Sequence, residues 1–203
     1  MKKLLFTIGL IAFVLALILV FRANRNITIA IQPFEKQDSA IINCIKTNLE
    51  KQFKAKCKVL PSIQLPASAY YKPRNRYRAD SIIAFLKRSQ ASEIDFSIGI
   101  TSKDISTTKG QYVDWGIFGL GYRPGPSCVV STYRLKNTNY THFLERIEKV
   151  ALHEIGHNLG LPHCQNHDLC VMNDAHGTVQ EVDENHNALC DKCQLKIKLK
   201  VGF

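Results

Sequence analysis

Three histidines and a glutamate in the second half of the chain have the spacing of a metal-dependent hydrolase. His153 and His157 are four residues apart, so on a helix both imidazoles lie on one face and can bind the same metal ion. Glu154 follows His153 directly and can hold a water molecule beside that ion. Gly160 tolerates the left-handed backbone that ends a helix, and the resulting turn lets His163 return as a third nitrogen ligand. Three ligands leave a tetrahedral zinc ion one open position for water, as in catalytic sites.

Four of the seven cysteines follow this pattern closely. They are Cys164, Cys170 and the Cys-x-x-Cys pair Cys190 and Cys193. Four thiolates are the ligand set of a closed, structural zinc site, and such a site would fix the segment that carries the third histidine. Two alternatives stay open: the four cysteines form two disulfides, or His167 replaces one thiolate. For Cys44, Cys57 and Cys128 we expect buried free thiols, with a Cys44–Cys57 disulfide as the alternative.

In these residues the sequence resembles the archaemetzincins, a metzincin-type family of zinc metallopeptidases. Their signature is His-Glu-x-x-His-x-x-Gly-x-x-His-Cys, four residues, Cys-x-Met, seventeen residues and Cys-x-x-Cys. It is matched in order by His153, Glu154, His157, Gly160, His163, Cys164, Cys170, Met172, Cys190 and Cys193. One departure is that five residues, not four, separate Cys164 from Cys170. The resemblance covers residues 27 to about 195.

The resemblance implies a zinc peptidase that acts on peptides or proteins and binds two Zn²⁺ ions per chain. The three histidines would hold the catalytic ion, and the four cysteines a structural one. Glu154 would act as general base and then as general acid, and Met172 would pack beneath the catalytic metal without binding it. Some metzincins stabilise the oxyanion with a tyrosine after this methionine, but the last tyrosine here is Tyr140, so the residue for that role is not identified.

The elements that must position these groups alternate between strands and helices. Apolar and β-branched runs predict strands at 27–31, 57–60, 96–100, 112–121, 128–133 and, in the alternating tail, 195–201. Capped amphipathic runs predict helices at 38–53, 79–89 and 139–159. The glycines in 112–121 favour an edge strand, which could pair with an extended substrate. We therefore expect an α/β fold: one compact metzincin-like domain over residues 26–203, with a mixed, mostly parallel sheet and an active-site helix.

An apolar run at the N-terminus predicts contact with a membrane. Residues 4–21 are interrupted only by Thr7 and Gly9, and as a helix they would be about 27 Å long, enough to cross a bilayer core. We expect residues 1–25 to be an N-terminal transmembrane anchor in the lipid bilayer, with the catalytic domain outside the cytoplasm. The alternatives are a cleaved signal sequence, followed by secretion, and a buried core helix.

Length and charge exclude several other classes of protein. The chain has 203 residues and a formal charge of +10, but four basic residues flank the apolar run, which leaves an excess of +6 in residues 26–203. We therefore expect no nucleic-acid partner, and we expect a monomer. No Gly-x-Ser-x-Gly nucleophile or phosphate-binding loop is present. The main rival to an enzyme is a membrane-tethered zinc domain that binds peptides without turnover.

Overall fold

A computed structural model of the protein describes residues 27–165 and 170–201. The predicted membrane anchor and His167 lie outside these residues. Among the helices within the described ranges, none combines the length and the apolar character that crossing a bilayer requires. The membrane prediction is therefore neither confirmed nor contradicted.

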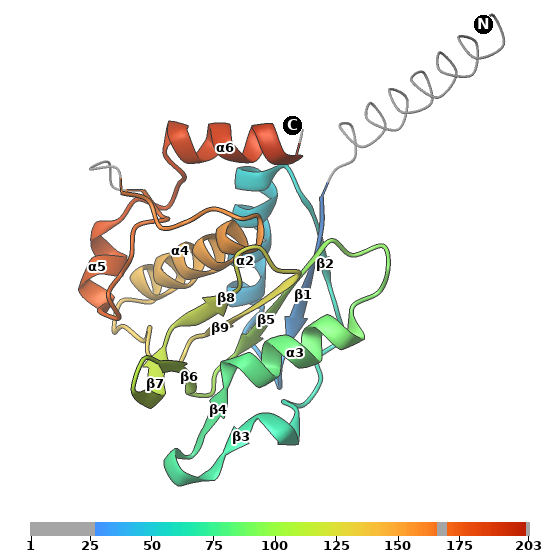
Figure 1. Ribbon diagram of the computed structural model, residues 1–203, viewed down its shortest axis with the longest axis vertical. Helices are drawn as coiled ribbons and strands as arrows, with labels where there is room; N and C mark the ends of the chain where they lie inside the picture. The colour runs from blue at the N-terminus through green and yellow to red at the C-terminus, as the bar shows by residue number, and fades with distance from the viewer. Residues whose placement is uncertain (1–26, 166–169, 202–203) are drawn as a thin grey trace, which may run out of the picture.

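Strands with two α-helices among them make up the described chain as far as Ser131, and further helices follow (Figure 1). The elements are β1 (Thr28–Pro33), α2 (Ser39–Phe53), β2 (Lys56–Val59), β3 (Tyr70–Tyr71), β4 (Arg76–Arg78), α3 (Ala79–Ser89), β5 (Phe96–Thr101), β6 (Ile105–Lys109), β7 (Tyr112–Ile117), β8 (Gly119–Gly121), β9 (Ser127–Ser131), α4 (Tyr140–Asn158), α5 (Val179–Glu184) and α6 (Asp191–Val201). Side-chain caps fix the starts of two helices, because Asp38 accepts a hydrogen bond from the N–H of Ala40 and Asn139 accepts one from that of Thr141.

The main sheet has the strand order β2-β1-β5-β9-β8. Its first four strands are parallel, and β8 is an antiparallel edge strand. The order β3-β4-β6-β7 gives a second, smaller sheet of mixed direction. The predicted α/β class and mixed, mostly parallel main sheet are confirmed, but the sequence analysis did not foresee the second sheet.

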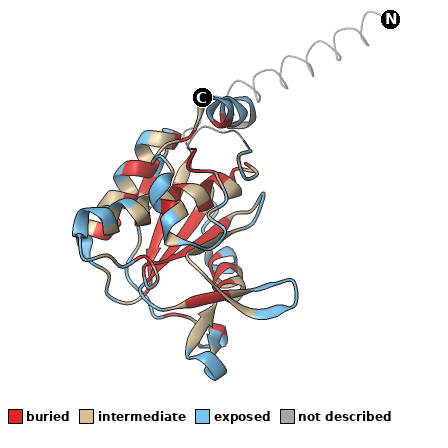
Figure 2. Ribbon diagram, turned by 90° about the vertical axis from the view of Figure 1, so that its left-hand side faces the viewer, coloured by how far each residue is buried: buried red, intermediate tan, exposed pale blue. Residues whose placement is uncertain are grey.

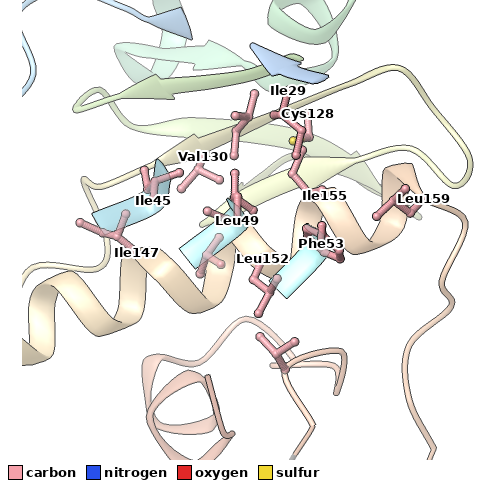
Figure 3. Packing of buried hydrophobic residues seen from close by; sticks show 14 of the residues in the cluster. Ile29, Ile45, Leu49, Phe53, Cys128, Val130, Ile147, Leu152, Ile155 and Leu159 are labelled. Atoms are coloured by element: carbon pink, nitrogen blue, oxygen red, sulfur yellow. The ribbon is translucent and has the colours of Figure 1, made fainter. Parts of the chain in front are cut away.

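Helices cover both faces of the main sheet (Figures 1 and 2). Alternate strand residues face opposite sides, so Ile29 and Val130 join the core under α2 and α4, whereas Val129 joins the core under α3. Ile45 and Leu49 of α2 meet Ile147 and Leu152 of α4 beneath the sheet (Figure 3), and all four are completely buried. This packing holds α4, the predicted active-site helix, against the sheet.

Two strand predictions need correction. The tail 195–201 is part of helix α6, because a helix buries Cys193 and Ile197 together, one turn apart, and leaves Leu195 and Leu199 exposed. The stretch 112–121 is divided: β7 is an edge of the small sheet and β8 an edge of the main sheet. The prediction of edge strands is thus confirmed, although they belong to two sheets.

Replacing Leu49 by Ala should destabilise the domain by about 2–5 kcal/mol, because it leaves a cavity between α2, α4 and the sheet. Leu199→Ala is the matched control, since the Leu199 side chain is 79% exposed, and it should change stability by less than about 0.5 kcal/mol. Chemical denaturation at a fixed zinc concentration measures both. Equal losses for the two variants would contradict the packing described here.

Candidate metal centre and active-site cleft

Three histidines converge at the end of α4. His153 and His157 lie on adjacent turns of this helix, and Gly160, with a φ of 90°, reverses the chain after it. The N–H of Leu161 then donates to the carbonyl of Gly156 at 2.9 Å, and the turn brings His163 back to the helix. One ring nitrogen from each histidine lies within 4.8 Å of the others, so the structure brings the three predicted ligands together.

The Nδ1 atom of each histidine lies close to a polar group of the protein. The Nδ1 of His153 lies 2.7 Å from the carbonyl of Val171, and the Nδ1 of His157 lies 2.8 Å from that of Leu161. A carbonyl can only accept a hydrogen bond, so each Nδ1 carries the proton and each Nε2 keeps its lone pair for a metal. Burial lowers the pKa of His153 to about 3 and also lowers the pKa of His157, which keeps both rings neutral. His163 has an acidic neighbour instead, with its Nδ1 3.5 Å from Asp174 Oδ2.

Glu154 lies between α4 and the edge strand β8. Its side chain is buried, and its carboxyl accepts a hydrogen bond from the backbone N–H of Gly121. Burial raises the pKa of this carboxyl to about 8, and the hydrogen bond opposes that shift. A cation at the histidines would favour the carboxylate form. The strand can approach this closely because residue 119 is a glycine. A Cβ at Gly119 would lie only 2.7 Å from Glu154 Oε1.

Met172 contacts helix α4 on a different side from β8. Met172 is completely buried, and its Sδ atom occupies the position that a side chain at Gly156 would need. Gly156 lies between the two histidines of α4, so Met172 packs directly behind the metal-facing surface of the helix. This is the position that the family resemblance implied for it.

The histidines and Glu154 line a cleft with a cavity volume of about 530 Å³. Its walls come from β6, β7 and β8 on one side and from the segment 171–185 on the other. Several residues of these walls were not predicted from the sequence, among them Asp80, Lys109, Tyr122 and Asp174. Tyr122 lies in the cleft but precedes α4 in the sequence. Its hydroxyl donates a hydrogen bond to Asp80 at 2.7 Å. The stretch 112–121, predicted as an edge strand that could pair with a substrate, was the one signal in the sequence that pointed to this wall, and it contains Trp115.

The four cysteines form a second cluster behind the third histidine. The Sγ atoms of Cys164, Cys170, Cys190 and Cys193 all lie within 4.8 Å of one another. No disulfide joins any of the cysteines, all of which fall within the described residues, and the 3.8 Å from Cys164 Sγ to Cys190 Sγ is far longer than a disulfide bond of about 2.05 Å. Two thiolates bound to one tetrahedral Zn²⁺ at about 2.3 Å would be about 3.8 Å apart. The residues therefore fit a zinc ion, and the extra residue before Cys170 does not displace it from the cluster.

The cysteine cluster is linked directly to the histidine site. The N–H of Cys164 donates to the carbonyl of Met172 at 2.8 Å, and the N–H of Cys190 donates to Cys170 Sγ at 3.3 Å. The cluster thus holds together the segments that carry His163 and Met172.

The remaining cysteines have no such neighbours. Burial raises the pKa values of the Cys44 and Cys57 thiols to about 12, which makes them poor nucleophiles. Both are free thiols, so the alternative of a disulfide between them is wrong.

Comparison with known proteins identifies relatives of this chain. Residues 26–199 match Peptidase family M54. An archaemetzincin of Archaeoglobus fulgidus is 35% identical over 170 residues, which are 84% of this chain and 98% of that protein. One of Halobacterium salinarum is 39% identical over 139 residues, which are 64% of this chain and 76% of that protein.

Solved structures agree with the fold. The crystal structure of the archaemetzincin of Archaeoglobus fulgidus complexed with malonate superposes with a TM-score of 0.71 at 34% identity, and the match covers 84% of this chain and 99% of that one. For the archaemetzincin of Methanopyrus kandleri the TM-score is 0.76 at 27% identity, with 88% and 97% covered. With its histidine site, its cysteine cluster and these relatives, the chain belongs to Peptidase family M54, the archaemetzincins, and is a zinc metallopeptidase.

Proposed function

We propose that this metallopeptidase cleaves peptide bonds in the cleft beside α4, with His153, His157 and His163 as the ligands of a catalytic Zn²⁺. The observation that carries this proposal is the convergence of three imidazoles beside a buried glutamate. Zn²⁺ held by the three rings would polarise the scissile carbonyl and lower the pKa of a water molecule.

Glu154 is the general base in this proposal. Its carboxylate accepts a proton from the attacking water and then delivers it to the leaving amine. The hydrogen bond from the N–H of Gly121 orients the carboxyl, which is buried and lines the cleft. No other glutamate or aspartate of the described chain has a comparable position, because Asp80 is engaged by Tyr122 and Asp174 adjoins His163.

The free edge of β8 is the proposed binding site for the substrate backbone. The N–H of Ser131 donates to the carbonyl of Phe118 at 2.8 Å, so Phe118 and, two residues on, Leu120 form their hydrogen bonds with β9. In an antiparallel pair the intervening residues point their backbone groups away from the partner strand. The N–H and C=O of Gly119 are therefore directed away from β9, where an extended peptide can add as a further strand.

The four cysteines are the proposed ligands of a structural Zn²⁺, which gives two zinc ions per chain. Three further proposals rest on the sequence. They are the membrane anchor at residues 1–25, the extracytoplasmic position of the catalytic domain and the monomeric state.

Replacing Glu154 by Gln should lower kcat for cleavage of a peptide library by about 10²–10⁴-fold, because the amide cannot accept the proton from water. The zinc content should stay that of the unchanged protein, since Glu154 is not a proposed ligand. Elemental analysis and mass spectrometry of the products measure both quantities. Unchanged cleavage with full zinc content would contradict the role of Glu154, and binding of peptides without cleavage by the unchanged protein would favour a non-enzymatic domain.

Replacing Gly119 by Ala should also lower kcat, by about 10²-fold, because the new Cβ displaces the Glu154 carboxyl from its position. Gly110→Ala on the neighbouring hairpin is the control, since a Cβ there meets no atom within 4 Å. The control should keep its activity. It should lose a little stability, because alanine is strained at the φ of +56° that Gly110 adopts. Wild-type activity in the Gly119 variant would show that β8 does not position the glutamate.

A further inference from the structure

The last helix of the described chain presents an apolar surface to solvent. In α6 the residues Cys193 and Ile197 face the domain and are almost completely buried, whereas Leu195 is 57% exposed and Leu199 is 79% exposed. The two leucines are four residues apart, so they lie one turn from each other on the outward face of the helix. Nothing within the described residues covers this face.

Lysines flank the two leucines. At 100° per residue, Lys192 and Lys196 lie on one side of the leucine pair and Lys198 on the other, and all three are exposed. Asp191, in the first turn, is the one acidic residue of the helix. Exposed leucines flanked by lysines are side chains with which a helix can contact a bilayer, the leucines among the acyl chains and the lysines at anionic headgroups.

The place of α6 in the fold agrees with this pattern. Figures 1 and 2 both show α6 at the end of the molecule where β1 begins. The same end carries further lysines, since Lys56 is in register with Thr28 and the exposed Lys54 follows α2. The acidic groups nearby are Asp95, whose Oδ2 accepts from the N–H of Thr28, Glu93, which pairs with Lys58, and Glu50, which accepts from the N–H of Cys57. Lysines therefore outnumber carboxylates at this end.

A short linker joins this end of the domain to the predicted membrane anchor. Only five residues, 22–26, separate the apolar run 4–21 from Ile27, and five extended residues reach at most about 18 Å. If residues 4–21 span a bilayer, the start of β1 and the neighbouring α6 cannot be far from its surface.

We propose that α6 is an interfacial helix that docks the catalytic domain onto a bilayer containing anionic lipid, with Leu195 and Leu199 inserted and the lysines at the headgroups. The proposal rests on the predicted anchor at residues 4–21 and not on the proposed extracytoplasmic position of the domain. It goes beyond the anchor, because a single span alone would leave the domain free to rotate about its linker. Two contacts at one end fix the orientation of the domain, and with it the direction in which the cleft opens.

Hydrogen exchange of the full chain in lipid nanodiscs tests this proposal. Discs of phosphatidylcholine alone are compared with discs that contain phosphatidylserine, so that the anchor is the same in both. Amides of residues 191–201 should exchange at least about fivefold more slowly in the anionic discs, the factor that one lysine near an anionic leaflet contributes. High salt should reduce this difference, because it screens the lysines. Incorporation of the chain into the discs reports on residues 4–21 separately.

Two double variants make the test specific. Lys196→Glu combined with Lys198→Glu should abolish the difference in exchange rate between the two kinds of disc. Leu195→Gln combined with Leu199→Gln should remove most of the protection of α6 in both kinds. The matched control is Lys72→Glu combined with Lys136→Glu, at two exposed lysines that follow β3 and β9 away from α6; it changes the net charge equally and should keep the difference. Equal exchange of α6 in both lipids would overturn the proposal. Protection that depends on protein concentration and not on lipid would do the same and would assign the leucines to a second copy of the chain.

Discussion

The close packing of helix α4 between two backbone segments is the constraint on which the rest of the structure depends. On one side the strand β8 passes so near that Gly119 and Gly121 leave no room for side chains, and on the other side Met172 fills the space at Gly156. These contacts fix the position of the helix, and its pitch then fixes His153, Glu154 and His157. The site is therefore rigid where its chemistry requires accurate placement.

The third histidine lies outside this helix and depends on a different support. His163 follows the Gly160 turn, and the next residue, Cys164, is tied to the backbone of Met172 and to the other cysteines. A metal ion on the four thiolates would thus hold the loop that completes the histidine site. The two clusters are chemically separate but mechanically coupled, and loss of the cysteine cluster would loosen the histidine site without removing any of its ligands.

The sequence was informative where chemistry follows from local spacing. The histidine pair, the Gly160 turn and the Cys-x-x-Cys pair are read from neighbouring residues, and the helices at 38–53, 79–89 and 139–159 are confirmed because caps and periodicity are local signals. The walls of the cleft were missed because they depend on long-range pairing, such as Ile105 with both Tyr77 and Ile117. The glycines of β8 indicated an edge strand and no more, since their need for space comes from Glu154, more than thirty residues later. The tail was predicted as a strand because alternation does not reveal which residues the domain will bury.

The central claim is that one chain carries two separate zinc centres, one of three histidines and one of four cysteines. Native mass spectrometry of the full chain in detergent, beside a variant with His153 and His157 both replaced by Ala, measures the number of zinc ions directly. We expect two ions in the unchanged protein and one in the variant, with the remaining ion held by the cysteines. No zinc in the unchanged protein, or the same number in both proteins, would contradict the claim.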